Sequence, residues 1–305
     1  MKRFLLFRSV PFLLLLGSAM LLFAQERASW KLLTVAGIEN VIEVSDRLLS
    51  GGQPENEQAF ANLKKLGVTT IISVDGSRPN LAAAKAQGLR YIHLPVGYDT
   101  ISTTRQAELL KAMQITEGKL FVHCHHGKHR GPAAAAIIER LAQGWSPEQS
   151  RAFMEQAGTS PSYRGLWKSV AECQAISPDK LAALIDPLPE LVEPPQLVDT
   201  MLSLDDRFEK LSFLTKEQKE LSREQLAGCR EDATQLTELL REWMRQEAAL
   251  AKPAEFRDSA QQMLNAAEAL EKQLQSAAKP PAILAAATLV SQSCKKCHVK
   301  FRDGN

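Results

Sequence analysis

The sequence predicts an α/β domain with a mainly parallel central sheet, followed by an all-α four-helix bundle. In the first half, apolar runs of strand length alternate with amphipathic runs of helix length, which is typical of a parallel sheet covered by helices. Residues 186–195 read Asp-Pro-Leu-Pro-Glu-Leu-Val-Glu-Pro-Pro, which neither a helix nor a strand tolerates in its interior. Beyond this break, apolar residues recur at alternating spacings of four and three, as in the helices of a bundle.

The first domain, expected over residues 38–180, alternates strands and helices in chain order. The expected strands are 41–44, 48–50, 68–74, 91–96 and 119–123. The first expected helix contains Phe60, Leu63 and Leu66 and ends at Gly67. The next three are expected at 81–87, 103–115 and 132–141, and the last begins at Ser146-Pro147. Glycine just after a helix and serine followed by proline at its start are the usual signals for these boundaries.

The second domain, expected over residues 196–305, follows a proline-rich linker at 187–195. Four apolar stripes of helical spacing predict its four helices. They are Leu197 to Leu211, Leu226 to Trp243, Phe256 to Leu274 and Ile283 to Phe301, with Pro253 and Pro280-Pro281 in two of the connections. Each stripe provides one inward face, so the four helices are expected to enclose a shared core.

Composition limits the classes of function. The chain has 305 residues, of which 45% are hydrophobic, enough for two domains with separate cores. Its 37 basic and 35 acidic residues leave a net charge of +2, so nucleic-acid binding is not expected.

The first 24 residues have the pattern of a secretion signal. Lys2 and Arg3 precede an uncharged stretch from Val10 to Ala24, which is short for a membrane span. Leu22 matches the small-residue cleavage pattern poorly, so an uncleaved membrane anchor is the alternative. In both cases the rest of the protein is expected to be exported, to the periplasm or elsewhere outside the cytoplasm, and membrane contact is expected only if the segment is retained.

A segment around Cys124 has the composition of an oxyanion-binding loop. Residues 123–131 read His-Cys-His-His-Gly-Lys-His-Arg-Gly between an expected strand and an expected helix. Backbone N–H groups of such a turn and the positive end of the following helix bind anions, and the planar fork of Arg130 can hold two anion oxygens. A thiolate stabilised in this way is a nucleophile. The phosphate-binding residues are expected to be His125, His126, Gly127, Lys128, His129, Arg130 and Gly131.

The pattern His-Cys-x-x-Gly-x-x-Arg resembles the signature of the protein tyrosine phosphatase superfamily. Residues 50–54, Ser-Gly-Gly-Gln-Pro, are similar to a segment of its small dual-specificity-like members, and the resemblance spans residues 40–175. It implies that Cys124 attacks phosphorus, that Arg130 binds the phosphoryl group and that an upstream aspartate protonates the leaving oxygen. Asp99 is near the family's position for this acid, and Asp75 is the second choice.

The loop departs from the family pattern in two respects. The family usually places serine or threonine after the arginine, where its hydroxyl helps the thiolate to leave, and this chain has Gly131. The chain also has three histidines in the loop, His125, His126 and His129. They could be metal ligands, but the favoured interpretation is that they add positive potential around the phosphate.

The C-terminal segment Cys294-Lys-Lys-Cys297-His298 has the pattern of a covalent haem site. Two thiols can bond the haem vinyl groups, and the adjacent imidazole can bind the iron. A zinc site would need further cysteine or histidine ligands, and the C-terminal sequence offers none. One covalent haem c is therefore expected, held by Cys294 and Cys297, with His298 as an axial ligand.

Residues 193–305 resemble the cytochrome c-prime family and the soluble four-helix cytochromes that bind b haem. In the electron-transfer members, a methionine early in the first helix caps the iron, whereas gas-binding members leave that side open. Met201 matches such a methionine and is the expected second axial ligand, with packing in the core as the alternative. Met244 and Met263 are candidates for the core.

Together these motifs predict an exported phosphomonoester hydrolase that uses a cysteinyl-phosphate and is tethered to a haem c domain for electron transfer or redox sensing. One alternative is an electron-transfer cytochrome whose first domain only binds an anion. Another is redox, sulfur or arsenate chemistry at Cys124, which would need a nearby resolving cysteine. A phosphorylated substrate and a redox partner protein are the expected partners. Cys173 and Cys229 are expected to be free, with Cys229 buried, rather than bridged.

Overall fold

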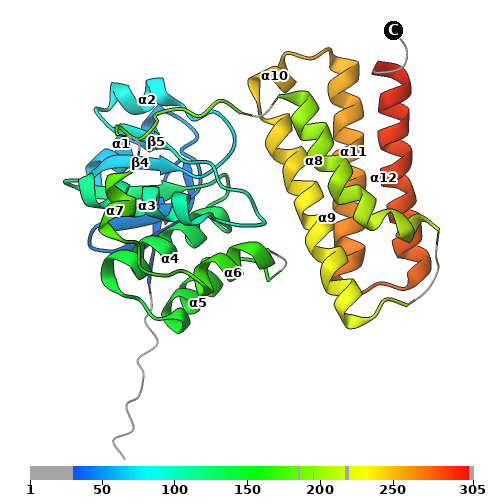
Figure 1. Ribbon diagram of the computed structural model, residues 1–305. Coiled ribbons are helices and arrows are strands. Elements are labelled where there is room, and N and C mark those ends of the chain that lie inside the picture. Colours follow the sequence, from blue (N-terminus) through cyan, green and yellow to red (C-terminus); the bar gives the residue numbers. More distant parts are fainter. Residues whose placement is uncertain (1–29, 162, 185, 195, 217–219, 302–305) are drawn as a thin grey trace, which may run out of the picture.

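The computed structural model describes residues 30–301 except 162, 185, 195 and 217–219. An α/β domain and a helical bundle lie side by side and are joined by an extended segment (Figure 1). The expected signal segment, residues 1–24, lies outside the described residues. In the part of the chain that the structure describes, no helix is both long and apolar enough to cross a membrane.

The α/β domain is built on a six-stranded sheet with the order β1-β2-β3-β6-β4-β5. The strands are β1 (Lys31–Val35), β2 (Ile38–Ser45), β3 (Leu48–Gly51), β4 (Val68–Ser73), β5 (Arg90–His93) and β6 (Lys119–His123). Strands β3, β6, β4 and β5 pair in parallel, with Gly51 and Ser73 both opposite His123 at one end of the sheet. The loop at Cys124 therefore leaves the sheet from its central strand.

The sheet is mixed, because β1 and β2 add an antiparallel edge to the four parallel strands. Sequence analysis predicted the parallel part and missed β1. This edge strand is largely exposed, so it lacks the continuous apolar run that marks a buried strand. The turn between β1 and β2 contains Gly37 at φ +79°, a conformation that glycine adopts without strain.

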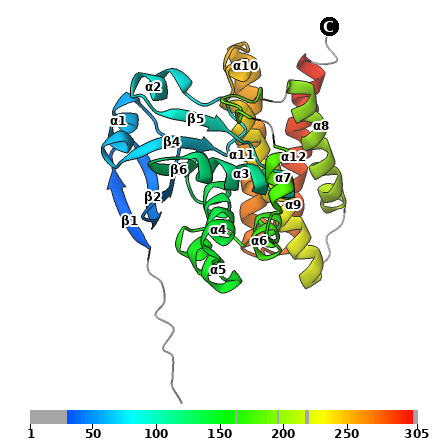
Figure 2. The same ribbon diagram turned by 60° about the vertical axis from the view of Figure 1, so that its left-hand side comes forward.

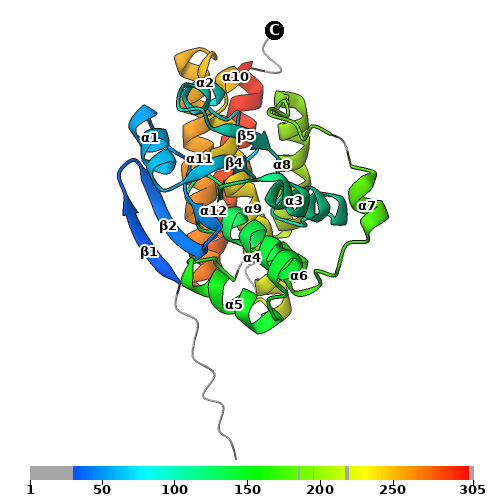
Figure 3. The ribbon, with the colours of Figure 1, turned by 90° about the vertical axis from the view of Figure 1, so that its left-hand side faces the viewer.

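Helices cover both faces of the sheet (Figures 2 and 3). One face carries α1 (Glu57–Lys65) and α2 (Leu81–Ala86), whose apolar residues pack with Phe121 of β6. The other face carries α3 (Thr103–Ile115), α4 (Arg130–Gln143), α5 (Pro147–Gln156) and α6 (Arg164–Ala171). Short helix α7 (Pro178–Ala182) contacts α3. Sequence analysis missed α6 and α7, and it placed the start of α4 two residues late.

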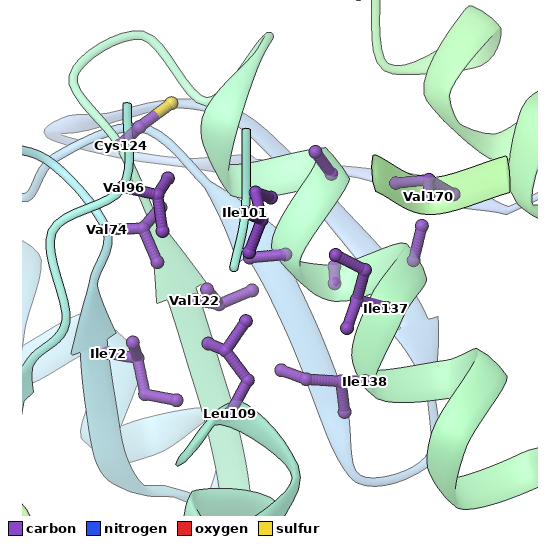
Figure 4. Close-up of a cluster of buried hydrophobic side chains, with 14 of the residues drawn as sticks. Ile72, Val74, Val96, Ile101, Leu109, Val122, Cys124, Ile137, Ile138 and Val170 are labelled. Carbon is purple, nitrogen blue, oxygen red and sulfur yellow. The ribbon is translucent and has the colours of Figure 1, made fainter. Parts of the chain in front are cut away.

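The core beneath Cys124 is almost entirely aliphatic. Figure 4 shows Cys124 near Val74 and Val96, with the core continuing through Val122 towards Ile137 and Ile138. These residues come from the central strands, from the segment after β5 and from α4. Because the core fixes both the end of β6 and the first turns of α4, it holds the two ends of the loop between them.

The second domain contains the four long helices that the apolar stripes predicted. They are α8 (Leu197–Leu211), α9 (Arg223–Met244), α11 (Ala254–Gln275) and α12 (Pro280–Phe301), with the 3-10 turn η1 (Ser212–Thr215) and the short helix α10 (Glu247–Leu250) in the connections. A capping box at Ser222 and Gln225 starts α9. Helix α8 packs mainly on α9, and α12 packs mainly on α11.

The two domains have separate apolar cores. In the described chain, each apolar cluster belongs to one domain or to that domain and its adjoining linker. Helix α9 is the bundle helix nearest the α/β domain, and α12 lies on the far side of the bundle (Figure 1). Charged and polar side chains make the contacts between α9 and the first domain, and these contacts converge on the loop at Cys124.

Candidate active site

Cys124 lies where an anion-binding cysteine is expected, between the end of β6 and the start of α4. Its residue surface is 4% exposed, so the thiol lies at the floor of the site and not on the outer surface. Helix α4 begins at Arg130, and its N-terminal end directs unpaired N–H groups and positive potential towards the loop. The strand, turn and helix therefore have the arrangement that the sequence predicted.

Close backbone contacts fix the shape of the loop. Gly127 has φ +68°, and a Cβ there would lie 2.2 Å from the carbonyl carbon of Gly51, so no other residue fits without displacing β3. The side-chain amide of Asn40 donates to the Gly127 carbonyl at 2.8 Å. The hydroxyl of Thr159 donates to the Lys128 carbonyl at 2.7 Å. These bonds hold the carbonyls outward and leave the N–H groups for the interior of the loop.

The backbone N–H groups of residues 126–130 form the candidate anion nest. Within the described residues, they have no hydrogen-bond acceptor in the protein. Successive unpaired N–H groups at a helix N-terminus bind phosphate-like anions. Residues 126–130 therefore present backbone donors to the interior of the loop, whereas the N–H of His125 donates to Asp75 Oδ2 at 3.1 Å.

Arg130 is buried at the centre of the site, with 2% of its surface exposed. Its Nη2 donates to Asp75 Oδ2 at 2.9 Å, its Nη1 donates to Glu242 Oε2, and its guanidinium carbon lies 4.4 Å from the centre of the Tyr98 ring. Its Nε is buried and has no hydrogen-bond partner. Burial alone would lower the pKa of Arg130, but Glu242, Tyr98, Asp75 and Cys124 raise it well above its usual value. The side chain is thus a permanent cation.

Asp75 positions the site and is unsuited to donate a proton. It is 1% exposed and accepts hydrogen bonds from the N–H groups of His125 and Ser77 as well as from Arg130. Burial favours the neutral acid, but Arg130 and Arg245 outweigh it and hold the pKa of Asp75 well below its usual range. A carboxylate that stays ionised cannot act as the general acid, which leaves Asp99 as the candidate for that role.

Asp99 lies at the mouth of the site. It is exposed, it accepts a hydrogen bond from the N–H of Thr100 at 3.0 Å, and it lines a hollow of about 460 Å³ together with Arg130 and Glu242. Asp99 and Arg130 therefore line the same hollow, together with residues of the bundle. The role of Asp99 as the general acid stays a prediction.

Two of the three loop histidines are in surroundings that disfavour their charged form. Burial lowers the pKa of both His125 and His129 to about 4, so both are neutral at pH 7. His129 packs against the ring of Tyr163, with 4.1 Å between the ring centres, and His126 is paired with Glu39 at the surface. His125 and His129 therefore add no positive potential. In the described part of the chain, no group of three or more His, Cys, Asp or Glu side chains is arranged to hold a metal ion.

Gly131 lies directly beside the thiol. A Cβ at this residue would lie 3.5 Å from Cys124 Sγ and 3.2 Å from the Cys124 nitrogen. The residue is in the first turn of α4, and its φ is outside the left-handed region. A serine hydroxyl at this position could therefore reach the sulfur, and this chain lacks it.

Sequence analysis missed the contribution of the bundle to the site. Arg245, the residue that follows α9, donates to both carboxylate oxygens of Asp75 at 3.3 and 3.4 Å, and Glu238 of α9 accepts from the Tyr98 hydroxyl at 3.0 Å. Glu242 contacts Arg130 directly. The only sequence signal was a run of charged residues on α9, which is equally typical of a solvent-exposed helix face.

The residues of the expected haem site lie on two helices of the bundle. Cys294, Cys297 and His298 are partly buried on α12, and Met201 is partly buried on α8. Cys294 and Met201 both pack against the main apolar cluster of the bundle. Met263 is buried, with its Sδ 3.5 Å from Cys294 Sγ, and Met244 also packs against the core, as expected for core residues.

Two thiols, an imidazole and a thioether are the donor types that a covalent haem with two iron ligands needs. Burial above all, with the neighbouring Cys297 and Asp205, raises the pKa of Cys294 to about 11. Met201 is one turn before Asp205 on the same face of α8. All five cysteines are free thiols, including buried Cys173 and Cys229, so neither of the expected haem thiols is committed to a disulfide.

Residues 200–302 match the sequence profile of the family described as Cytochrome C'. The first domain is similar to the dual specificity protein phosphatase TpbA of Pseudomonas aeruginosa, with 29% identity over 123 residues, 39% of this chain and 55% of that protein. It is also similar to the beta-lactamase hydrolase-like protein of Xylella fastidiosa, with 28% identity over 158 residues, 48% of this chain and 35% of that protein.

The crystal structure of P. aeruginosa TpbA matches at 25% identity with a TM-score of 0.42, covering 50% of this chain and 93% of that chain. This chain spans about a third to about half of the length of the curated relatives it matches. The comparisons thus find a region similar to dual-specificity phosphatases joined to a Cytochrome C' region within one chain.

Proposed function

We propose that this protein is an exported phosphomonoester hydrolase that works through a cysteinyl-phosphate and is tethered to a haem c domain. The observation that carries the proposal is the buried Arg130 beside Cys124, with an unpartnered Nε and a row of unpaired backbone N–H groups around the same space. This donor set is suited to a tetrahedral dianion. The likeness of the first domain to TpbA supports the same chemistry.

The chemistry proceeds in two displacements. In the first, the Cys124 thiolate attacks phosphorus, the bond to the leaving oxygen breaks, and Asp99 transfers its proton to that oxygen. In the second, Asp99 accepts a proton from a water molecule, the water oxygen bonds to phosphorus, and the P–S bond breaks to return the thiolate. Arg130 and the loop N–H groups hold the phosphoryl oxygens throughout, and Asp75 keeps Arg130 in place.

The bundle is proposed to hold one covalent haem c through Cys294 and Cys297. His298 and Met201 would be the residues that bind its iron, because the two residues lie on helices that border the same core cluster. A bound haem with two protein ligands supplies one-electron transfer. A redox partner protein and location in the periplasm follow from this assignment and from the expected secretion signal.

Two observations favour a second candidate function. Gly131 provides no hydroxyl to assist the second displacement, and the Glu242 carboxylate of the bundle is paired with Arg130. In that case the protein is an electron-transfer cytochrome whose first domain binds an anion without hydrolysing it. Redox or arsenate chemistry at Cys124 would instead require a resolving thiol close to it.

Hydrolysis of p-nitrophenyl phosphate by the full-length, haem-loaded protein separates these functions. The phosphatase proposal predicts turnover that Cys124→Ser abolishes, whereas Cys173→Ser retains it. Turnover that persists in Cys124→Ser would refute the cysteinyl-phosphate. No turnover by the parent chain, with oxyanion binding retained, would favour the anion-binding cytochrome.

A further inference from the structure

Helix α9 places a carboxylate on the catalytic arginine. Glu242 Oε2 accepts from Arg130 Nη1, and the side chains of Arg130 and Glu242 are 3% and 15% exposed. A Cβ on Gly76 would lie 1.9 Å from Glu242 Oε1, so the carboxylate lies directly against the backbone that follows β4. The hydroxyl of Ser77 also donates to the Glu242 carbonyl at 3.3 Å. The end of α9 is therefore held tightly over the site.

Glu242 uses a donor that a bound phosphoryl group needs. Asp75 takes Nη2 of Arg130 from within the α/β domain, and Glu242 takes Nη1 from the bundle, which leaves Nε alone. A carboxylate and a phosphoryl group make the same charge-assisted hydrogen bonds to a guanidinium. Burial raises the pKa of Glu242, and the adjacent Arg130 opposes that shift by favouring the carboxylate, which would repel a phosphate dianion in a buried site. Phosphate and Glu242 should therefore compete for Arg130.

The neighbouring residues on the same side of α9 hold it in this position. Glu238 accepts from Tyr98, whose ring lies over Arg130, and Arg241 donates to Glu238 at 2.6 Å. Arg245 reaches Asp75 one turn after Glu242. This side of α9 thus matches the mouth of the site in both shape and charge.

The same contacts permit release. The α9 contacts with the α/β domain are hydrogen bonds and ion pairs, and the apolar cores of the two domains are separate. Interfaces of this polar kind allow domains to move apart without exposing a core. The linker at 187–195 joins the two domains and precedes α8 in the sequence.

We propose that the bundle is an intramolecular inhibitor of the Cys124 site, with Glu242 occupying the phosphate position on Arg130 until α9 moves away. The expected effect on catalysis rests on the proposed phosphatase function, whereas competition between Glu242 and oxyanions for Arg130 does not depend on hydrolysis. It gives the bundle a second role besides that of a haem carrier. Substrate must displace Glu242 before Cys124 can be phosphorylated.

The test compares Glu242→Gln with the matched control Glu247→Gln in the full-length, haem-loaded protein. Glu247 is exposed on α10, close in sequence to Glu242, so its replacement removes a charge without touching Arg130. Titration calorimetry with tungstate measures oxyanion affinity, and hydrolysis of p-nitrophenyl phosphate measures kcat/KM. We expect Glu242→Gln to tighten tungstate binding and raise kcat/KM by about tenfold or more, since a charge-assisted hydrogen bond no longer competes. Glu247→Gln should match the parent chain.

The outcomes separate this inference from the phosphatase proposal. Tighter tungstate binding without hydrolysis in any variant would support the inhibitor and refute the phosphatase. Hydrolysis by the parent chain with unchanged tungstate affinity in folded Glu242→Gln and Glu242→Ala would overturn the inhibitor.

The unmodified chain provides a measurement that does not depend on variant folding. Saturating tungstate should increase amide hydrogen exchange in the last two turns of α9, because Glu242 and its neighbours leave the α/β domain. Tungstate binding with no change in that exchange would overturn the proposal.

Discussion

Replacing Gly131 with serine should accelerate the second displacement, because it adds the hydroxyl that this chain lacks. The added Cβ would lie 3.5 Å from Cys124 Sγ, and the hydroxyl one bond further can donate to the thiolate that leaves in the second displacement. The residue is helical with φ outside the left-handed region, so the substitution imposes no backbone strain. The Cβ would be 3.2 Å from the Cys124 nitrogen, a contact that requires a small adjustment.

The magnitude follows from one hydrogen bond to a charged group. Such a bond contributes about 1.5–3 kcal/mol, which corresponds to about a ten- to hundredfold change in rate. The bond stabilises the departing thiolate, so it accelerates breakdown of the phosphoenzyme and leaves the number of sites phosphorylated in the first turnover unchanged. The parent chain should therefore show a burst followed by slow turnover.

Stopped-flow measurement of p-nitrophenol release tests this prediction. Gly131→Ser should raise the steady-state rate at constant burst amplitude, and Gly131→Ala, which adds the same Cβ without a hydroxyl, should not. If the parent chain shows no burst and Gly131→Ser gives no gain, the reasoning about the missing hydroxyl is refuted.

The remaining predictions concern the haem, the histidines and the domains. Haem should stay bound through acid-acetone extraction because two thioethers hold it, and its loss would contradict the roles of Cys294 and Cys297. Met201→Ala should abolish a weak ferric band at the red edge of the visible spectrum, whereas an unchanged spectrum would return Met201 to the core. His123 is 1% exposed, and burial lowers its pKa from 6.5 to about 4. The unfolded chain therefore binds the extra proton, so His123 alone should lower folding stability by on the order of 3 kcal/mol as pH drops from 6.5 to 4, a contribution that His123→Gln should remove from the pH dependence of thermal melts. Because the cores are separate, fragments divided at 187–195 should each fold, and insolubility of both with a soluble whole would contradict this.

Local patterns made much of the fold predictable. The apolar stripe that ends at Trp243 and the one that begins at Ile283 could be recognised from helical spacing within a single segment, and both segments are helices in the structure. The Cys124 loop was equally predictable, because a nucleophile, a tight glycine turn and an arginine at one strand-to-helix junction lie within nine residues. Strand β1 was missed because an exposed edge strand carries little periodic signal.

The electrostatics of the site could not be read from the sequence. Charge on a histidine depends on burial, and His125 and His129 are neutral because neighbours distant in sequence desolvate them. Asp75 and Asp99 were both candidates for the acid, and only the surrounding arginines distinguish them. Glu242 lies more than a hundred residues from Arg130, so no local pattern could join the two.

Trapping the phosphoryl group on Cys124 is the decisive experiment for the proposed cysteinyl-phosphate. The full-length protein is mixed with p-nitrophenyl phosphate, quenched within the burst and digested for mass spectrometry. We expect a phosphoryl adduct on the peptide that contains Cys124, at a higher fraction in the parent chain than in Gly131→Ser. Hydrolysis of the substrate with no adduct on that peptide would contradict it.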